Sequence, residues 1–482
     1  MNATRMTRCA TSSNVDSHRP PPHRRVAPRD LTCNPNLGIQ LHPHCVPTQM
    51  SVEIKKHRVD GPDDTKLWEL TSAFCKEWKN NTDALGARNI LAAFYLLCLV
   101  ARNSLEIFPA DESWFEYIGR FLALYVRDTN TDTKERVRLS PYVTDLLESK
   151  ATLKNKVTVR TLTEEAGPAG WAEMINTDCN KATKTKVPEI VSADDLSDPR
   201  LELVVMAAEY IKGHWVDAFH DTVTGHPFYG TGEGAAVGKC NLMSHRDFEK
   251  SGNGCLYWEG QYCDVVLLPT TRGEPNQPKV LTTIYAIVVL PKGEDNKPTD
   301  PEMMDKAAEE IQNNLPALRA VVEKNERSRV MLQMPRIKQK MTPVEITSDC
   351  RKIFPEKLMG QSMINGVTQV EKTTMGLGWQ NSPMEVAAVY HATFLQVHET
   401  GFEAAAATAI VCYRSLGAAD PDAIKFVTCT RGFLFFLAEM GPQPHVLYLS
   451  RVLDDTGLKD APKAPEEEGG TISEHAYKSP EE

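Results

Sequence analysis

The sequence predicts an α+β protein, in which helices dominate the first third of the chain and β-strands the last half. Three observations support this fold class. Apolar residues recur at helical spacing early in the chain, and long runs of β-branched and aromatic residues occur late in it. The 482 residues show no internal repeat and no steady alternation of strand and helix. Without that alternation, the pattern indicates helices and sheets that are segregated along the chain.

Three segments are expected to be helical. Residues 67–78 place four large apolar side chains on one stripe at helical spacing. The thirteen-residue run 89–101, NILAAFYLLCLVA, is too short to span a membrane and suits a buried helix. An amphipathic stretch over residues 302–324 breaks near Pro316, because proline lacks the amide donor that a helix interior requires. The residues of the first stripe are Leu67, Leu70, Phe74 and Trp78.

Two later segments are expected to form strands. Residues 281–291, LTTIYAIVVLP, are a continuous run of β-forming residues closed by a proline. Residues 433–453, FLFFLAEMGPQPHVLYLSRVL, contain two apolar runs around a Gly-Pro turn, which is the pattern of a β-hairpin. The sheets are therefore predicted to lie mainly in the second half of the chain.

Composition and charge limit the possible functions. The net charge of −10 argues against a nucleic-acid-binding surface over the whole chain, because phosphate contacts need a basic footprint. No apolar run reaches the length of a membrane span. The twelve cysteines include no CxxC pair and no metal-ligand spacing, so we predict buried, reduced thiols, no metal and no cofactor. We expect neither nucleic acid nor a membrane as a partner.

The two ends of the chain differ from its middle. Residues 1–50 are rich in arginine and proline, which predicts a disordered basic arm, and Met50 offers an alternative start codon that would leave the arm untranslated. The arm lacks the apolar segment of a secretory signal, so we expect an intracellular, for example cytoplasmic, location; a misannotated N-terminus would allow an extracellular one. Residues 456–482 carry acidic clusters and are expected to be a disordered tail, which leaves residues 51–455 as a single domain.

Catalytic motifs are largely absent from the sequence. The stretch 230–240, GTGEGAAVGKC, resembles a phosphate-binding loop, but its glycine spacing differs and Cys240 replaces the hydroxyl that would hold magnesium. We interpret it as a flexible loop. The HPH triplet at 42–44 lacks further ligands and is interpreted as surface histidines. No nucleophile elbow, paired-histidine zinc motif or dinucleotide fingerprint occurs, so we predict that the protein is not an enzyme.

The most informative stretch is 399–417, ETGFEAAAATAIVCYRSLG. As a β-strand, residues 402–413 would carry a single charge, Glu403, and could slide between two existing strands at little desolvation cost. Gly401 would supply a hinge. The alternative is a helix, because alanine is the best helix former. Composition leaves both structures open.

The same stretch resembles the hinge region of the serpins, the serine protease inhibitor fold. Within residues 389–410, VYHATFLQVHETGFEAAAATAI, Gly401, Glu403 and the alanine run stand where inhibitory serpins carry them. Five further segments resemble serpin segments in the same order, so that the resemblance covers roughly residues 65–455. These segments are INTDCNKATKTKVPEIV, YIKGHWVDAF, IYAIVVLPKGED, MPRIK and FLFFLAEMGPQPHVLYLSRVL.

The resemblance implies a serpin fold with three β-sheets, eight or nine helices and an exposed reactive-centre loop over about residues 399–424. In this family a target protease cleaves the loop, forms an acyl-enzyme with it, and is disabled when the loop inserts into the central sheet. Insertion would add ladder hydrogen bonds on both edges of the new strand, so the native state is expected to be metastable and the inhibitor to be consumed. The implied hinge residues are Glu399, Gly401, Phe402, Glu403, Ala404, Ala405, Ala406, Ala407 and Thr408.

Arg414 and Ser415 form the predicted reactive bond, which resembles the Arg-Ser bond of antithrombin. Arginine before the cut would occupy the acidic pocket of a trypsin-like protease. Counting from Gly401, the usual loop length instead puts Ser415 on the amino side of the cut, whereas a loop one residue shorter gives Arg414. The remaining interpretation is that Arg414 is a surface arginine with no role in recognition by a protease.

The resemblance also assigns roles outside the loop. His391 matches the histidine beneath the opening sheet, called the shutter, and Trp215 matches the tryptophan at the top of the sheet, called the breach. Ordinary core packing is the alternative for both. Arg336 and Glu399 occupy positions where serpins often place an ion pair that keeps the hinge docked, worth about 1 kcal/mol or less if it is exposed.

Departures from the family pattern surround the shutter. The aligned helix offers Ala93, Phe94 and Leu96 in place of polar residues, and Ala207 stands where an asparagine is expected. We therefore expect His391 to lose its usual partners, at a cost of about 1–3 kcal/mol unless another group replaces them.

Two further departures concern moving parts. Phe402 replaces a small residue directly after the hinge glycine, and its ring is expected to slow insertion. Asp178 replaces a common tryptophan. Both changes put the inhibitory mechanism in doubt more than the fold.

Three functions follow from these features. The alanine run and Arg414 favour a monomeric inhibitor of a trypsin-like serine protease. Phe402 and the altered shutter favour a non-inhibitory serpin that serves as carrier, chaperone or storage protein and is merely cut by proteases. Cross-class inhibition of papain-like cysteine proteases is the third possibility.

Overall fold

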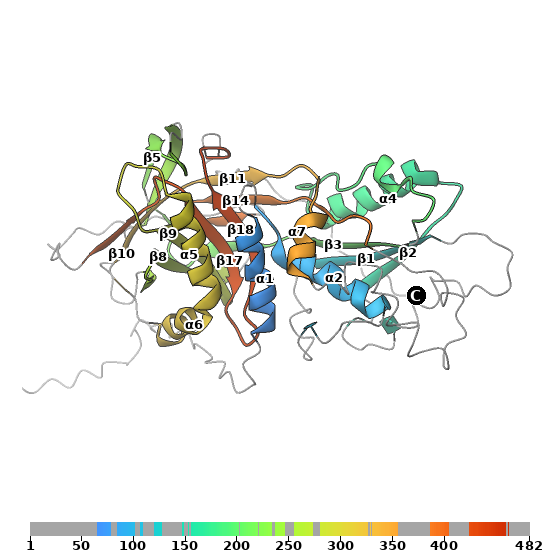
Figure 1. Ribbon diagram of the computed structural model, residues 1–482, viewed down its shortest axis with the longest axis horizontal. Helices are drawn as coiled ribbons and strands as arrows, with labels where there is room; N and C mark the ends of the chain where they lie inside the picture. The colour runs from blue at the N-terminus through green and yellow to red at the C-terminus, as the bar shows by residue number, and fades with distance from the viewer. Residues whose placement is uncertain are drawn as a thin grey trace, which may run out of the picture. The chain divides into compact units, whose positions relative to one another are not determined.

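The computed structural model describes most of the chain from residue 65 to residue 461 (Figure 1). The chain divides into two units, Met1–Arg58 and Val59–Glu482, and every described residue lies in the second unit. The predicted basic arm lies outside the described residues. These are 65–78, 84–101, 107–108, 120–127, 147–148, 153, 156–201, 203–219, 221–233, 237–245, 255–272, 280–325, 328, 330–354, 386–403, 424–458 and 461.

The described residues include six α-helices, and the three predicted helical segments are among them. The predicted break falls between α5 and α6, at Asn314. Pro316 lies in the first turn of α6, where a backbone N–H has no hydrogen-bond acceptor within the helix, so a proline there costs no hydrogen bond. No helix in this part of the chain is long and apolar enough to cross a membrane. The helices are α1 (Lys66–Glu77), α2 (Ala87–Ala101), α4 (Gly167–Ala182), α5 (Pro301–Asn313), α6 (Leu315–Lys324) and α7 (Thr347–Ile353).

The largest sheet has nine strands in the order β11-β14-β15-β4-β8-β9-β17-β18, with β7 paired to β8. The predicted strand and the predicted hairpin are confirmed as β9 and as β17 with β18. Every residue of β17 and β18 is buried, which explains why most of their side chains are apolar. The strands are β4 (Lys212–Trp215), β7 (Leu256–Glu259), β8 (Cys263–Arg272), β9 (Val280–Pro291), β11 (Ile337–Lys340), β14 (Phe394–His398), β15 (Gly401–Glu403), β17 (Phe433–Glu439) and β18 (His445–Val452).

Three smaller sheets complete the described part. One has three strands in the order β2-β1-β3, the second four strands in the order β16-β10-β6-β5, and the third pairs β12 with β13. None of the pairings among the described strands joins β3 to β13 or β14. The strands are β1 (Arg120–Arg127), β2 (Val157–Leu162), β3 (Leu203–Glu209), β5 (Asp221–Phe228), β6 (Gly238–His245), β10 (Val330–Pro335), β12 (Val344–Glu345), β13 (Tyr390–His391) and β16 (Lys425–Thr428).

Helices cover the sheets through apolar faces. In strand β1, Leu122 and Leu124 face one core with α2, while Ala123 and Tyr125 face a second core with α4. Figure 1 accordingly shows α2 and α4 on opposite sides of β1–β3. Helix α1 packs against β18, at the edge of the large sheet, and α5 packs against β9 and β17. A third core lies between this sheet and the four-stranded sheet. These layers confirm the α+β class.

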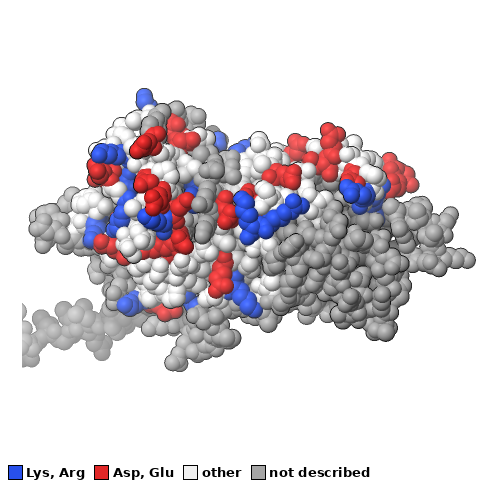
Figure 2. All heavy atoms as spheres, viewed as in Figure 1, with Lys and Arg blue, Asp and Glu red and all other residues white. Residues whose placement is uncertain are grey.

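The surface and the cysteines agree with an ordinary globular protein. Figure 2 shows acidic and basic side chains interspersed over the described part of one face. The cysteines in the described residues are free and buried, as predicted, and the remaining cysteines lie outside these residues. The described ones are Cys75, Cys98, Cys179, Cys240, Cys255, Cys263, Cys350 and Cys429.

Candidate functional site

Strand β15 is the first part of the predicted hinge, and it is already part of the large sheet. It lies between β14 and β4 and runs antiparallel to both. Phe402 pairs with Val397 on one side and with Gly213 on the other. Of the two structures that composition left open, the strand is therefore confirmed for residues 401–403. The Ala404–Ala407 run and Thr408 lie outside the described residues.

Two glycines allow this close packing. A Cβ atom on Gly401 would collide with the backbone carbonyl oxygen of Gly213, so only glycine fits there. A Cβ atom on Gly213 would in turn collide with the ring of Phe402. The hinge glycine therefore does more than allow bending, because it lets two strands approach each other.

Phe402 fills the space beside these glycines. Its side chain is 2% exposed, and its ring centroid lies 5.5 Å from that of Trp215. The sequence predicted that this ring would slow insertion as it passed inward. In the structure the ring is already inside, and the effect on insertion stays a prediction.

Trp215 supports the turn that precedes β15. Its indole is buried, and its Nε1 donates to the carbonyl oxygen of His398 at 2.9 Å. Its ring also packs edge-to-face against Phe219. Trp215 thus contacts both the end of β14 and the ring of Phe402. It lies at the point where the hinge enters the sheet.

The ion pair between Arg336 and Glu399 is buried rather than exposed. The two side chains are 7% and 10% exposed, and Nε of Arg336 donates to the Glu399 carboxylate at 2.8 Å. The Thr222 hydroxyl donates to the same carboxylate at 2.6 Å. Burial alone would raise the pKa of Glu399, but the hydrogen bonds from Arg336 and Thr222 hold it below its ordinary value. The small contribution expected for an exposed pair therefore does not apply here.

His391 has partners that the sequence did not reveal. Its Nε2 accepts a hydrogen bond from the backbone N–H of Gly86 at 3.0 Å and lies 2.5 Å from the Thr393 hydroxyl oxygen. Other groups thus stand in for the usual partners of this imidazole, which is the exception that the expectation allowed. Ala207 lies in β3 and pairs with Leu122 of β1. The backbone hydrogen bond to His391 comes from Gly86, just before α2, whereas the family pattern places polar partners further along that helix.

A second buried ion pair near the shutter was missed from the sequence. Arg88, in the first turn of α2, contacts Glu209 at the end of β3, and its Nε donates to that carboxylate at 3.3 Å. Both side chains are fully buried. Tyr448 donates its hydroxyl to the backbone oxygen of Glu209 at 3.3 Å. An arginine within an otherwise largely apolar helix was the available signal, but its partner lies 121 residues away.

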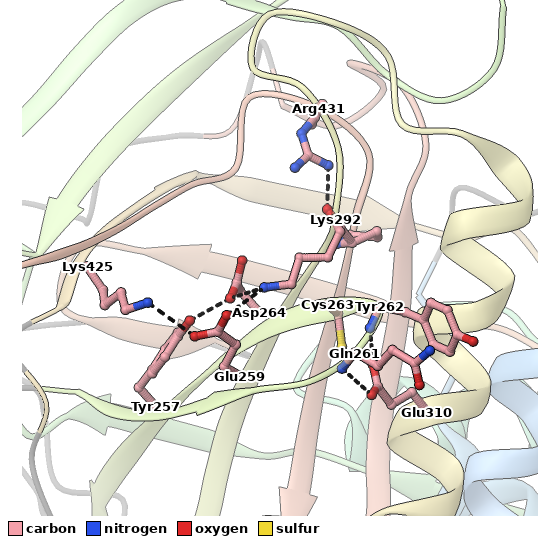
Figure 3. Close-up of polar contacts among 11 residues, drawn as sticks. Tyr257, Glu259, Gln261, Tyr262, Cys263, Asp264, Lys292, Glu310, Lys425 and Arg431 are labelled. Carbon is pink, nitrogen blue, oxygen red and sulfur yellow. Dashed lines mark hydrogen bonds and ion pairs between the residues drawn. The ribbon is translucent and has the colours of Figure 1, made fainter.

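The chain after the loop is fixed to a different sheet. Strand β16 begins at Lys425 and pairs in parallel with β10. Figure 3 shows the Lys425 ammonium group beside Glu259 of β7, at 3.1 Å. Lys292 links the same carboxylate to Asp264, and Tyr257 donates to Asp264 at 2.5 Å. The two ends of the segment 404–424 are thus held in separate sheets.

The site holds a short strand between two neighbours, two buried ion pairs and a buried histidine. No group of three or more metal-binding side chains occurs in the described part. The predicted reactive bond, Arg414–Ser415, lies outside the described residues.

Comparisons with known proteins agree with this fold. The family model "Serpin (serine protease inhibitor)" matches residues 150–454, more than half of the chain. Serpin-Z1C of Triticum aestivum is 25% identical over 290 residues, which cover 60% of this chain and 65% of that protein. An uncharacterized serpin-like protein of Methanosarcina acetivorans is 25% identical over 288 residues, covering 59% and 58%. The matched region spans about three-fifths of the length of these relatives.

Solved structures show the same architecture. The thermophilic serpin tengpin in its native state superposes with a TM-score of 0.56 at 13% identity, covering 82% of this chain and 95% of that one. Cleaved Serpin 42Da gives 0.55 at 14% identity, covering 80% and 97%. A thyroxine-binding globulin complex with thyroxine gives 0.53 at 15% identity, covering 81% and 99%. At these identities the likeness concerns the fold, and together with the family model it leads to one conclusion: the chain belongs to the serpin family.

Proposed function

We propose that the protein is a suicide-type inhibitor of a trypsin-like serine protease. The protease would cut the loop between Arg414 and Ser415, remain attached as an acyl-enzyme, and be disabled as the loop enters the sheet. The observation that supports this proposal is β15, because residues 401–403 already occupy the position from which a longer strand would grow. The loop has begun to pair with the sheet that would receive it.

The register of β15 defines the rest of the path. Continuing its pairing brings Ala406 opposite Thr393 and Thr408 opposite His391 on one side, and Glu209 and Ala207 on the other. On the face of the sheet that Phe402 shares with these residues, the side chains of Thr393 and His391 are buried. Small uncharged residues suit such a face, because a buried charge would oppose entry.

The central experiment mixes the protein with trypsin and, separately, with a papain-like protease, followed by a denaturing gel. We expect a covalent complex with trypsin in wild type and its loss in Arg414→Ala. A complex with the papain-like enzyme instead would support cross-class inhibition. Complex formation that survives Arg414→Ala but not Ser415→Ala would move the cut to the other candidate bond.

A substitution on the insertion path separates trapping from simple cleavage. Ala406→Arg places a charge on the buried face, so we expect the loop to be cut without complex formation. Ala406→Ser is the matched control, because it adds polarity without charge, and it should still form the complex. Equal complex formation by the arginine variant would contradict insertion as the trapping step.

The non-inhibitory alternative is favoured by one observation. The ring of Phe402 is enclosed by Gly213 and Trp215, so any shift of β4 against β14 during insertion must disturb a packed aromatic cluster. In that case both proteases would cut near Arg414 and no complex would form. The same gel therefore decides between the two functions.

A further inference from the structure

The packed part of the chain continues past the end of the family match. The family model matches residues 150–454, whereas Leu458 is 0% exposed. Its side chain belongs to the core between the large sheet and the four-stranded sheet, together with Ile337 of β11 and Leu242 of β6. Burying a leucine side chain is a substantial source of stability, so residues 455–458 are a structural part of the domain.

Local hydrogen bonds shape this C-terminal segment. The backbone N–H of Thr456 donates to the Asp454 carboxylate at 2.8 Å, and the N–H of Leu458 donates to the carbonyl oxygen of Asp455 at 3.1 Å. Gly457 has a φ of 75°, a backbone conformation that favours glycine. The segment is therefore a defined turn that leads into the buried Leu458.

The turn contacts one strand of each neighbouring sheet. The N–H of Lys338 in β11 donates to the carbonyl oxygen of Gly457 at 2.8 Å. Strand β11 is the first in the order of the large sheet, and this bond lies on its edge. The N–H of Lys239 in β6 donates to the Asp455 carboxylate at 3.2 Å. Residues 455–458 thus bridge the large sheet and the four-stranded sheet.

Arg336 lies between the two bridged strands. It links β10 to β11, so it is the residue at which the chain passes from the four-stranded sheet to the large sheet. Its backbone N–H donates to the carbonyl oxygen of Asn241 in β6 at 2.8 Å. The contacts of the turn, at Lys338 and Lys239, lie two residues from Arg336 and from Asn241, respectively. The turn therefore supports the backbone on both flanks of this arginine.

The side chain of the same arginine holds the hinge. Its Nε donates to the Glu399 carboxylate at 2.8 Å, and both side chains are buried. A buried ion pair stabilises a protein only when its geometry is good, because both charges have been removed from water. Any shift of the link between β10 and β11 would move the guanidinium group away from this geometry.

We propose that residues 455–458 form a C-terminal clasp that positions Arg336 for its contact with Glu399. The clasp keeps β11 and β6 together beside the arginine, and Leu458 fills the core between their sheets. Asp455 and Gly457 are positioning residues, because they act on Arg336 through these two strands. The inference concerns the intact protein and does not depend on protease trapping.

Gly457→Ala tests the clasp in the full-length protein. The added Cβ atom would collide with the carbonyl oxygen of Lys338, so the turn must move off β11. Gly167→Ala is the matched control, because Gly167 at the start of α4 also has a positive φ, 59°, but an added Cβ would meet nothing within 4 Å. In urea unfolding at pH 7, Gly457→Ala should raise the unfolding equilibrium constant at least about tenfold more than Gly167→Ala does.

A double-mutant cycle with Glu399→Gln tests the positioning role. The factor by which Glu399→Gln raises the unfolding equilibrium constant reports how much the pair contributes. In Gly457→Ala this factor should be at least about tenfold smaller than in wild type, because a displaced arginine has less to lose. In Gly167→Ala it should keep its wild-type value. A turn that only fills the core would leave the factor unchanged in both backgrounds.

Two results would overturn the clasp. One is an equal loss of stability in the two glycine variants, and the other is the same Glu399→Gln factor in Gly457→Ala as in wild type. If Gly457→Ala does not fold, Asp455→Ala takes its place in the cycle, because it removes the acceptor of the Lys239 N–H without a collision. In that background the factor should fall about threefold, and an unchanged factor would equally overturn the proposal.

Discussion

At the scale of single residues, two buried histidines are held neutral around the hinge. Burial lowers the pKa of both His391 and His398 to about 4, from an ordinary value of 6.5. His391 receives hydrogen bonds at Nε2 only while that nitrogen is unprotonated. Nε2 of His398 has no hydrogen-bond partner among the described residues. Neither imidazole can accept a proton at neutral pH without disturbing its surroundings.

The free energy of unfolding should therefore fall as the pH decreases from 6.5 towards 4. In this range the unfolded chain binds protons at both histidines and the folded chain does not, so each site contributes up to about 3 kcal/mol that is present above pH 6.5 and lost towards pH 4. Urea unfolding at pH 7 and 4.5 measures the change. His391→Gln, which cannot titrate, should show a smaller loss than wild type, and an identical loss would contradict the assignment.

The Arg336–Glu399 pair should behave as a buried pair. Glu399→Gln or Arg336→Met leaves one buried charge without its partner, at a cost of about 3–5 kcal/mol, whereas the double variant should cost less than either single change. Urea unfolding of the three variants at pH 7 tests this. Because the pKa of Glu399 is lowered in the folded state, its contribution is present above its ordinary pKa and is lost as the pH falls through the folded value. Additive losses in the double variant would show that the two side chains act independently.

At the scale of elements, the docked hinge depends on one fit between two strands. Gly213→Ala should destabilise the protein by about 1–3 kcal/mol, because the added methyl group meets the Phe402 ring. Phe402→Ala should cost about 3–5 kcal/mol through the cavity it leaves. In the double variant the methyl group occupies part of that cavity, so the two costs should not add. Urea unfolding of the double-mutant cycle measures the coupling, and simple additivity would contradict the packing.

The elements differ in how far the sequence could predict them. Helix α1 and the hairpin β17–β18 follow from local periodicity and turn residues, so their positions were predictable. Strand β15 was not, because its place in the sheet depends on the distant Gly213, which pairs with Phe402 and leaves room for its ring. The partner of His391 was missed for the same reason, since Gly86 lies 305 residues away. Family resemblance located His391, Trp215 and the Arg336–Glu399 pair, but burial of that pair required the assembled fold.

At the scale of the whole molecule, the insertion mechanism predicts a large change in heat resistance. Cutting the loop should allow about ten new ladder hydrogen bonds, each worth about 0.5–1.5 kcal/mol, and should raise Tm by roughly 10 °C or more. Calorimetry of cut and intact protein measures the shift. Cut Ala406→Arg protein should gain much less than cut Ala406→Ser protein. A cut wild type that melts with the intact protein would contradict a metastable native state.

Lys425 is attached to both β10 and Glu259, and this attachment affects when the protein can change its conformation. Glu403 is held in one sheet and Lys425 in another, so an unbroken chain between them keeps its two ends at a fixed separation. Insertion of the first end, as proposed, would draw on the chain that leads to β16 and its salt bridge. Breaking a single peptide bond removes that opposition at once, so the covalent continuity of the backbone, rather than any one contact, would determine when the conformational change begins.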